Sequence, residues 1–434
     1  MASRTDAQNR TDPQKELAHR FATTRALSLD LVARLSDADA SAQSMPDASP
    51  AKWHLAHTSW FFETFVLRDH VPGYCAYDDR FAYLFNSYYE AEGPRHARPQ
   101  RGLLTRPSLA EVCEWREHVD AAVPAALPHL SPAALALIEL GIQHEQQHQE
   151  LLLTDIKHLF AQNPLAPAMW IAPEPAFANE VAQFSTLSSP RGEASPIRWI
   201  EGSEGLVSIG HSGAGFAFDC ELPQFSALLT RHALASRTVT NGEWQDFIDD
   251  GGYRMPPLWL SDGWAWVQAE HIDAPAYWQD GRQFTLAGWR DIDPAAPVAH
   301  ISFFEADAFA SWAGARLPTE IEWEAAAAAL DPASGQQMDT AGPAHPAAAD
   351  GDTGLQQMFG SVWEWTGSAY RPYPGFRAAP GAVGEYNGKF MSGQFVLRGG
   401  SCATPRGHVR ATYRNFFYPH QRWQFTGLRL AKDI

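Results

Sequence analysis

Two histidines that stand four residues apart, His144 and His148, interrupt the leucine-rich segment QHEQQHQELLL at residues 143–153. On a helix, positions i and i+4 differ by about 40° and one turn, so both imidazoles can bind one metal ion. The same stripe carries Leu140 and Asp155, and a helical bundle would bury it. Two core histidines with ordinary hydrogen bonds would give the same pattern, so the pair alone leaves metal binding and core packing open.

A third ligand has to come from another helix. Glu150 completes an HxxxHxE motif, but it lies about 200° from His148 on the helical wheel and points elsewhere. His57, within WHLAHTSWFFETF, is centred on an apolar stripe, and His54 lies about 60° to one side. We therefore predict His57 as the third ligand, with His54 beside the site or on the surface. Three neutral nitrogens without a thiolate leave coordination positions open, which is typical of catalytic iron, zinc or copper.

Four helices are expected to position these histidines. A long amphipathic pattern predicts the first at residues 12–36, and further helix candidates lie at 49–70, 106–127 and 131–160. The second and the fourth open with Ser49-Pro50 and Ser131-Pro132, a cap followed by proline at the first helical position. Four helices of these lengths indicate a bundle. The long loop at 81–107 is rich in aromatics and arginines, which favours a functional loop.

The rest of the chain has a different character. Residues 166–195 are rich in Pro, Ala and Ser, which indicates a linker after a bundle at 14–165. From 196 to 434, short strands and frequent turns alternate with helical pieces such as 240–250 and 319–330, which predicts an irregular α+β domain. The low-complexity segment 331–354 is expected to be an exposed loop.

Bulk properties exclude several classes of protein. A formal net charge of −17 argues against binding to nucleic acid or to anionic membranes, which needs a basic face. The sequence has no membrane-length apolar run, and its N-terminal residues show no secretory signal. The four cysteines are far apart and form no CxxC, which fits a reducing compartment. We therefore expect a cytoplasmic protein that acts on small molecules.

Several long motifs resemble a known family. SPAKWHLAHTSWFFETFVL, FNSYYEAEGPRHARPQRGLLTRP and HEQQHQELLLTDIKH are similar to the DinB-like domain of EgtB-type sulfoxide synthases of ergothioneine biosynthesis. ARLPTEIEWEAAA, GSVWEWTGS and VLRGGSCATP resemble the formylglycine-generating-enzyme-like module, a C-type lectin fold, of the same enzymes. The resemblance runs from about residue 18 to the end. It implies an α+β multidomain protein in which a DinB-like four-helix bundle precedes the lectin-like domain.

The resemblance also implies a reaction. Members of this family are non-haem iron(II) oxygenases that join a thiol sulfur to C2 of hercynine, the betaine of Nα-trimethylhistidine. The same O2 oxidises the sulfur to a sulfoxide. The family's iron-binding histidines fall on His57, His144 and His148, and Gln147 matches a position that contacts hercynine. The expected cofactor is Fe(2+), and the expected substrates are hercynine, L-cysteine and O2.

The C-terminal segment RNFFYPHQRW is placed by the resemblance at the hercynine pocket. A quaternary ammonium group needs aromatic faces, because it cannot be hydrogen-bonded. Phe416 and Phe417 are the expected walls, and Asn415 is the expected donor to the carboxylate. Phenylalanines packed in the core of the lectin fold would give the same sequence.

Two further features concern the sulfur donor and the proton donor. The tyrosine pair Tyr88 and Tyr89 resembles the cysteine-using branch of the family, so we assign it as the proton or hydrogen-atom donor. Phe417 replaces an acidic residue of the branch that uses γ-glutamylcysteine, which favours free L-cysteine. Arg95 and Arg98 are the preferred partners of the cysteine carboxylate, because a guanidinium binds a carboxylate in a bidentate way. Arg101 and Arg106 are further candidates in the same loop.

Other functions remain open on the sequence alone. The same scaffold could use γ-glutamylcysteine or a selenium donor, or could attack another imidazole carbon as in an ovothiol-type reaction. A metal-dependent thiol transferase on a DinB-like bundle would consume no O2. A non-catalytic lectin-like module would bind no iron.

Overall fold

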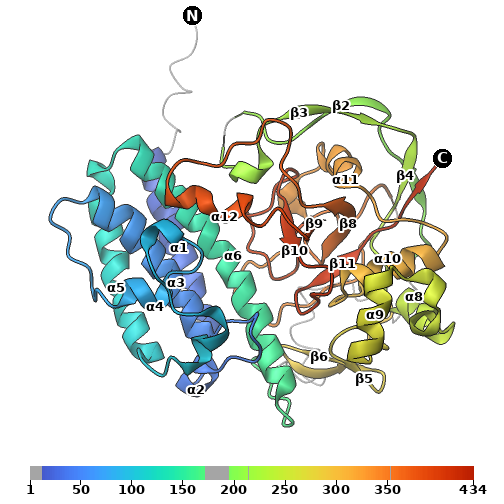
Figure 1. Cartoon of the computed structure of the whole chain (residues 1–434), viewed down its shortest axis with the longest axis horizontal. Helices are drawn as coiled ribbons and strands as arrows, with labels where there is room; N and C mark the ends of the chain where they lie inside the picture. Colours follow the sequence, from blue (N-terminus) through green and yellow to red (C-terminus); the bar gives the residue numbers. More distant parts are fainter. Residues whose placement is uncertain (1–11, 172–194, 214, 352) are drawn as a thin grey trace, which may run out of the picture. The chain divides into compact units, whose positions relative to one another are not determined.

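The computed structural model describes residues 12–171, 195–213, 215–351 and 353–434. The chain divides into two compact units, with the boundary between Ile156 and Lys157. The first unit is helical, and the second combines short helices with strands (Figure 1). Most of the predicted linker, residues 172–194, lies outside the described residues. Among the helices that the structure describes, none is long and apolar enough to cross a membrane.

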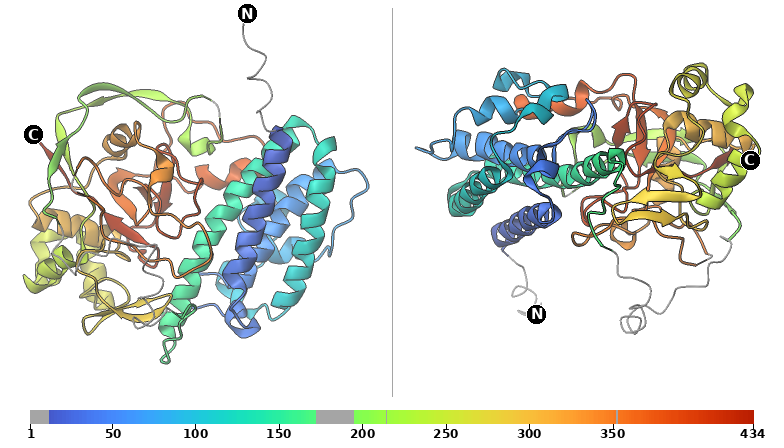
Figure 2. Two further views of the ribbon diagram at one scale, coloured as in Figure 1. Left: turned by 180° about the vertical axis from the view of Figure 1, so that it is seen from behind. Right: turned by 90° about the horizontal axis from the view of Figure 1, so that it is seen from below.

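Four long helices form the first unit and continue into short helical turns. In chain order the elements are α1 (Pro13–Val32), α2 (Asp37–Ser41), α3 (Ala51–Phe62), η1 (Glu63–Arg68), α4 (Phe81–Phe85), η2 (Glu90–Glu92), η3 (Arg98–Leu103), α5 (Leu109–Ala126), η4 (Leu127–His129) and α6 (Pro132–Gln162). The helices α1, α3, α5 and α6 coincide with the four predicted segments and run alongside one another (Figure 2). The predicted bundle is therefore present.

The helix starts follow from local hydrogen bonds. The side chain of Ser131 accepts the amide N–H of Ala134 at 3.2 Å, as expected for the cap of α6. The prediction for Ser49-Pro50 was wrong, because α3 begins at Ala51 and its N-terminal Pro50 supplies no side-chain cap. The polar groups of Ser49 are engaged elsewhere: its N–H donates to Asp155 Oδ2 at 2.7 Å, and its hydroxyl accepts from Arg101 at 2.9 Å.

Two features of the first unit have no counterpart in the expected pattern. The turn after α3, η1, is a π-helix rather than a continuation of the α-helix, and such insertions are frequent near functional sites. The expected loop at 81–107 is not structureless, because it contains α4, η2 and η3. Asn86 ties this segment together, since its side-chain amide donates to the carbonyls of Tyr89 and Gly93. The aromatic and arginine side chains of the segment are therefore held by local structure.

Within the described residues of the second unit, short strands make up four small sheets. The strands are β1 (Trp199–Glu201), β2 (Gly205–Ile209), β3 (Phe225–Leu229), β4 (His232–Ala235), β5 (Trp278–Gln279), β6 (Arg282–Thr285), β7 (Gly288–Asp291), β8 (Trp363–Ala369), β9 (Phe395–Arg398), β10 (Asn415–Phe417), β11 (Thr426–Leu428) and β12 (Ala431–Asp433). They pair in the orders β1-β4-β12, β10-β9-β8-β11, β2-β3 and β5-β6-β7. All pairs are antiparallel except β8 with β11.

Helices lie between these strands. They are η6 (Asp219–Glu221), α8 (Asn241–Asp249), η7 (Gly252–Arg254), η8 (Pro256–Leu258), α9 (Ser261–Glu270), α10 (Phe303–Trp312), α11 (Glu320–Ala327), η9 (Pro332–Ser334), η10 (Ala382–Gly384) and α12 (Glu385–Gly388). The predicted helices at 240–250 and 319–330 correspond to α8 and α11. Each starts with a capping box, Thr240 with Glu243 and Thr319 with Glu322, which satisfies the first free N–H groups. The α+β class is confirmed.

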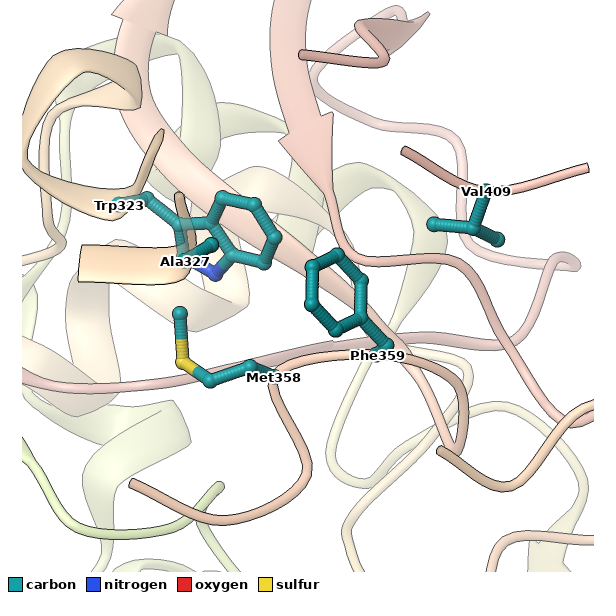
Figure 3. Packing of buried hydrophobic residues seen from close by; sticks show 5 residues of the cluster. All are labelled: Trp323, Ala327, Met358, Phe359 and Val409. Atoms are coloured by element: carbon teal, nitrogen blue, oxygen red, sulfur yellow. The ribbon is translucent and has the colours of Figure 1, made fainter. Parts of the chain in front are cut away.

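One core cluster of this unit contains Trp323, Ala327, Met358, Phe359 and Val409 (Figure 3). The prediction of an exposed loop at 331–354 was wrong in its first part, because Gln337 and Met338 are buried. The backbone of Met338 donates to the carbonyl of Thr404 at 2.9 Å and accepts from the N–H of Arg406 at 3.0 Å. This pairing attaches the segment to the chain that follows β9.

Candidate metal centre

The three predicted ligands meet within the first unit. His57 comes from α3, and His144 and His148 lie one turn apart on α6. One potential ligand atom from each of the three lies within 4.8 Å of the others. Glu150 is not among the described residues that form this group, as its position on the helical wheel predicts. The arrangement is a three-histidine site built by two helices.

Hydrogen bonds fix two of the rings. Nδ1 of His57 donates to the carbonyl of Phe85 at 2.6 Å, which leaves Nε2 free to bind a metal. Nδ1 of His148 lies 2.9 Å from Nδ1 of His54, so Nε2 of His148 is also the free nitrogen. Nδ1 of His144 is buried and has no hydrogen-bond partner among the described residues. A buried imidazole nitrogen without a partner is costly, and a metal ion would satisfy it.

Aromatic rings hold the histidines in place. Trp53 stacks on His57 at 4.6 Å between ring centroids, and Trp60 stacks on the same ring at 5.4 Å. Phe61 packs against His144 at 4.9 Å. All three aromatic residues belong to α3, so the helix that supplies one ligand also restrains the rings. Such packing reduces the reorganisation that metal binding requires.

Burial keeps the imidazoles neutral. It lowers the pKa of His144 to about 4. Burial, followed by the neighbouring His144, lowers the pKa of both His57 and His148 well below the ordinary value of 6.5. A neutral imidazole has a lone pair to donate. The donor set of three neutral nitrogens therefore fits a divalent transition metal with open positions.

Two places were predicted for His54, beside the metal site or on the surface, and the structure places it beside the site. It is buried, and its Nε2 lies 3.1 Å from Asp155 Oδ2. The sequence contained a signal for this partner, because Asp155 follows His148 by seven residues, about two helical turns. Histidine ligands of metals usually donate their second N–H to a fixed acceptor, and His54 stands beside Nδ1 of the predicted ligand His148.

The assigned tyrosines lie in the segment that follows α4. Tyr89 is buried, and its ring packs at 5.4 Å from Trp60, the residue that stacks on His57. Tyr88 is half-buried, and its hydroxyl accepts from Nη1 of Arg98 at 2.5 Å. Tyr89 is thus separated from the ring of a ligand by one indole.

The arginines of the same segment differ in their partners. Arg95 pairs with Glu90 at 2.6 Å, and Arg98 binds the Tyr88 hydroxyl and the carbonyl of Asp47. Arg101 is buried and forms no ion pair with a described carboxylate. Its guanidinium donates to the hydroxyls of Ser49 and Ser87 and lies 3.3 Å from the centroid of a Trp53 ring.

The charge of Arg101 is only partly compensated, by the nearby Asp155 carboxylate. Burial, followed by the nearby Arg98, lowers its pKa to about 9.

The remaining predicted residues are divided between the units. Gln147 is half-buried on α6, next to His148. Asn415, Phe416 and Phe417 form β10 in the second unit. Adjacent strand residues point to opposite faces, so Phe416 faces away from the other two and stacks on Tyr370 at 4.2 Å.

A buried ion network surrounds the carboxylate next to His144. Glu145 accepts from Arg25 at 3.0 Å and from Arg116 at 2.7 Å, and the hydroxyl of Ser28 donates to it at 2.6 Å. Arg25 and Ser28 belong to α1, and Arg116 belongs to α5. This carboxylate therefore fastens the ligand helix α6 to two other helices.

Comparison with known proteins shows which families the two units resemble. Residues 20–152 match the DinB superfamily, and residues 199–434 match the sulfatase-modifying factor enzyme 1-like domain. The hercynine oxygenase of Mycobacterium tuberculosis is 35% identical over 98% of this chain and 100% of its own length. That of Mycolicibacterium smegmatis is 34% identical over 97% of this chain and 99% of its own length.

The chain belongs to the hercynine oxygenase family. The resemblance seen in the sequence is thereby confirmed, as is the order of the two folds. As a member of this family the protein is an O2-dependent oxidoreductase. A further relative, ergothioneine biosynthesis protein 1 of Schizosaccharomyces pombe, is 29% identical over 50% of this chain and 28% of its own length.

Proposed function

We propose that this hercynine oxygenase forms a bond between the sulfur of L-cysteine and C2 of hercynine and oxidises that sulfur to a sulfoxide, in ergothioneine biosynthesis. The C2–H and S–H bonds are lost and a C–S bond forms. One oxygen atom of O2 enters the sulfoxide, and the other leaves as water with the two hydrogens. The four electrons that reduce O2 all come from the two substrates, so no further reductant is needed.

The observation that carries the proposal is the group formed by His57, His144 and His148, with ligand atoms within 4.8 Å of one another. O2 reacts slowly with closed-shell thiols, so the reaction requires a redox-active metal. Zinc has no redox chemistry, which favours iron(II) at this site. When bound, iron would supply open positions at which the thiol and O2 react together, and the three histidines would hold it there.

Substrate-binding roles are proposed for residues of each unit. Gln147 is proposed to hydrogen-bond the imidazole of hercynine, since it is adjacent to His148 on α6. In the second unit, the resemblance assigns Asn415 to the hercynine carboxylate and Phe416 and Phe417 to its quaternary ammonium group. Asn415 and Phe417 share one face of β10 and can act together, whereas Phe416 is on the other face, stacked on Tyr370. Holding C2 close to the sulfur lowers the entropic cost of joining the two substrates.

The sulfur donor is proposed to be free L-cysteine. Its carboxylate needs a cation, and Arg95 and Arg98 are the assigned partners. Arg98 supports this role better than Arg95, because Arg95 is already paired with Glu90. The tyrosines are proposed to deliver a proton or hydrogen atom during oxygen reduction, and Tyr88 would be positioned for this by Arg98.

A competition experiment tests the reaction and the donor together. Iron(II)-loaded protein receives hercynine with equal amounts of L-cysteine and γ-glutamylcysteine, and O2 is then added. We expect O2 consumption and a product with the mass of hercynylcysteine sulfoxide. A predominant γ-glutamyl product would overturn the donor, and a thiol adduct formed without O2 consumption would indicate a transferase.

Ligand variants test the metal site directly. His57→Ala should abolish sulfoxide formation and remove stoichiometric iron, because two imidazoles from one helix bind too weakly alone. The matched control is His118→Ala, which changes an exposed histidine of α5 that packs against Tyr77. Full activity and iron content in His57→Ala would show that the third ligand is another residue.

A further inference from the structure

A chain of three polar side chains, two of them buried and His148 half-buried, leads away from the metal site. Asp155 Oδ2 lies 3.1 Å from Nε2 of His54, and Nδ1 of His54 lies 2.9 Å from Nδ1 of His148. His54 and Asp155 are 3% and 5% exposed. His54 is not a member of the three-histidine group itself, so its contact with the metal would be indirect.

The hydrogen bonds that run from Asp155 through His54 to His148 determine which ring nitrogen carries each proton. A carboxylate only accepts hydrogen bonds, so Nε2 of His54 must carry its proton and donate to Asp155. A neutral imidazole has a single N–H, and Nδ1 of His54 is therefore an acceptor. The 2.9 Å contact is then a hydrogen bond only if His148 carries its proton on Nδ1. The lone pair of His148 is left on Nε2, the nitrogen that faces away from this contact.

We propose that His54 and Asp155 are positioning residues that hold His148 in the Nδ1–H tautomer and thereby present Nε2 to the metal. This inference rests on the metal site proposed above and concerns its assembly. The backbone contributes as well, because the N–H of Ser49 also donates to Asp155 Oδ2, at 2.7 Å. That second hydrogen bond keeps the carboxylate oriented toward His54.

His57 shows why such a device is needed. Its tautomer is fixed by a backbone carbonyl, that of Phe85, at 2.6 Å. His148 lies on the middle of α6, where the helix's own carbonyls are already bonded within the helix. A side-chain acceptor must replace the carbonyl, and His54 occupies that place. As α3 carries both His54 and His57, one helix orients one ligand and supplies another.

The first test measures the tautomers in the metal-free protein. Ring-15N-labelled histidine is introduced, and long-range 1H–15N correlation spectra distinguish Nδ1–H from Nε2–H imidazoles. We expect His148 as the Nδ1–H tautomer and His54 as the Nε2–H tautomer. An Nε2–H tautomer at His148 would overturn the proposal, whatever the variants do.

The second test measures affinity for Co(II), which requires no turnover. His54→Phe removes the acceptor, and Co(II) affinity should fall by about 10- to 100-fold, the usual effect of losing such a partner. In His54→Asn the amide oxygen can take the place of Nδ1, so most of the affinity should return. The Co(II) absorption bands should also change in the Phe variant, because a tilted His148 alters the ligand field.

A matched control separates positioning from folding. Ser59→Ala removes a buried hydroxyl of the same helix that bonds Arg25 and touches no metal ligand, and it should leave Co(II) affinity unchanged. Equal Co(II) affinity in wild type, His54→Phe and His54→Asn would refute the positioning role. If the wild-type protein itself binds no Co(II), the metal site fails rather than this inference.

Discussion

Replacing Glu145 with glutamine should destabilise the bundle by about 3 kcal/mol or more. This carboxylate is 1% exposed and lies between the guanidinium groups of Arg25 and Arg116. Glutamine keeps the shape and can still accept from Ser28, but the two buried cations lose the charge between them. Removing one partner of a buried ion pair typically costs about 3–5 kcal/mol.

The lowered pKa of Glu145 independently indicates a loss of folding stability of similar size. Burial alone would raise this pKa, but the charges of Arg116 and Arg25 outweigh burial and lower it from 4.5 to about 2. That difference corresponds to about 3 kcal/mol, since each pH unit is worth about 1.4 kcal/mol. Because the folded-state pKa is lowered, this stability is fully present above pH 4.5 and is lost as the pH falls toward 2. The glutamine variant imitates the protonated state, so its deficit should shrink over the same range.

The assay is urea denaturation of metal-free protein, followed by the helical circular dichroism signal at pH 7 and at pH 3. The matched control is Glu139→Gln, which removes a carboxylate from the same helix and from an ion pair with Arg20. That pair is 38% and 22% exposed, so its loss should cost less than about 1 kcal/mol. Equal losses in both variants, or a Glu145→Gln deficit that does not change with pH, would refute the reasoning.

Two further predictions concern other parts of the chain. Tyr88→Phe and Tyr89→Phe should each divert O2 toward oxidation of the thiol alone or slow C–S bond formation by about 10²-fold, and unchanged product ratios in both would remove the pair from the mechanism. In the second unit, burial lowers the pKa of Lys157 to about 7, and its Nζ lies 2.6 Å from His300 Nε2. The unfolded chain therefore binds more protons between pH 7 and 10.5, so stability should rise with pH there by up to about 1.4 kcal/mol per unit. Lys157→Met should remove that slope in urea denaturation, and an unchanged slope would contradict the lowered pKa.

The helices of the first unit could be predicted from different local signals, such as the amphipathic pattern of α1 and the Ser131-Pro132 start of α6. Helical periodicity placed His57 at the centre of the apolar stripe of α3. In the structure the His57 ring contacts His144 and His148 on α6. The start of α3 could not be predicted in this way. Ser49 is a residue type that often caps helices. Here its N–H donates to Asp155 and its hydroxyl accepts from Arg101, and both partners are distant in sequence.

Tertiary contacts also explain the other differences. The segment that contains Met338 has the composition of a surface loop, yet its backbone pairs with Thr404 and Arg406. A composition rule detects no such pairing, because both partners lie more than 60 residues away. Likewise, four arginines of the segment at 81–107 were candidates for binding the carboxylate of cysteine. Only the structure distinguishes Arg95, which is paired with Glu90, from Arg101, which is buried and forms no ion pair with a described carboxylate.

Arg101 connects the segment at 81–107 to the carboxylate that orients His54. A buried guanidinium whose pKa is lowered to about 9 by burial and by Arg98 is destabilised in its charged form. The Asp155 carboxylate raises that pKa and therefore stabilises the charged form in part. Arg101 contacts Ser49, and the N–H of Ser49 donates to Asp155, the residue that orients His54. Arg101, Ser49, Asp155 and His54 therefore form one connected polar path that ends at His148.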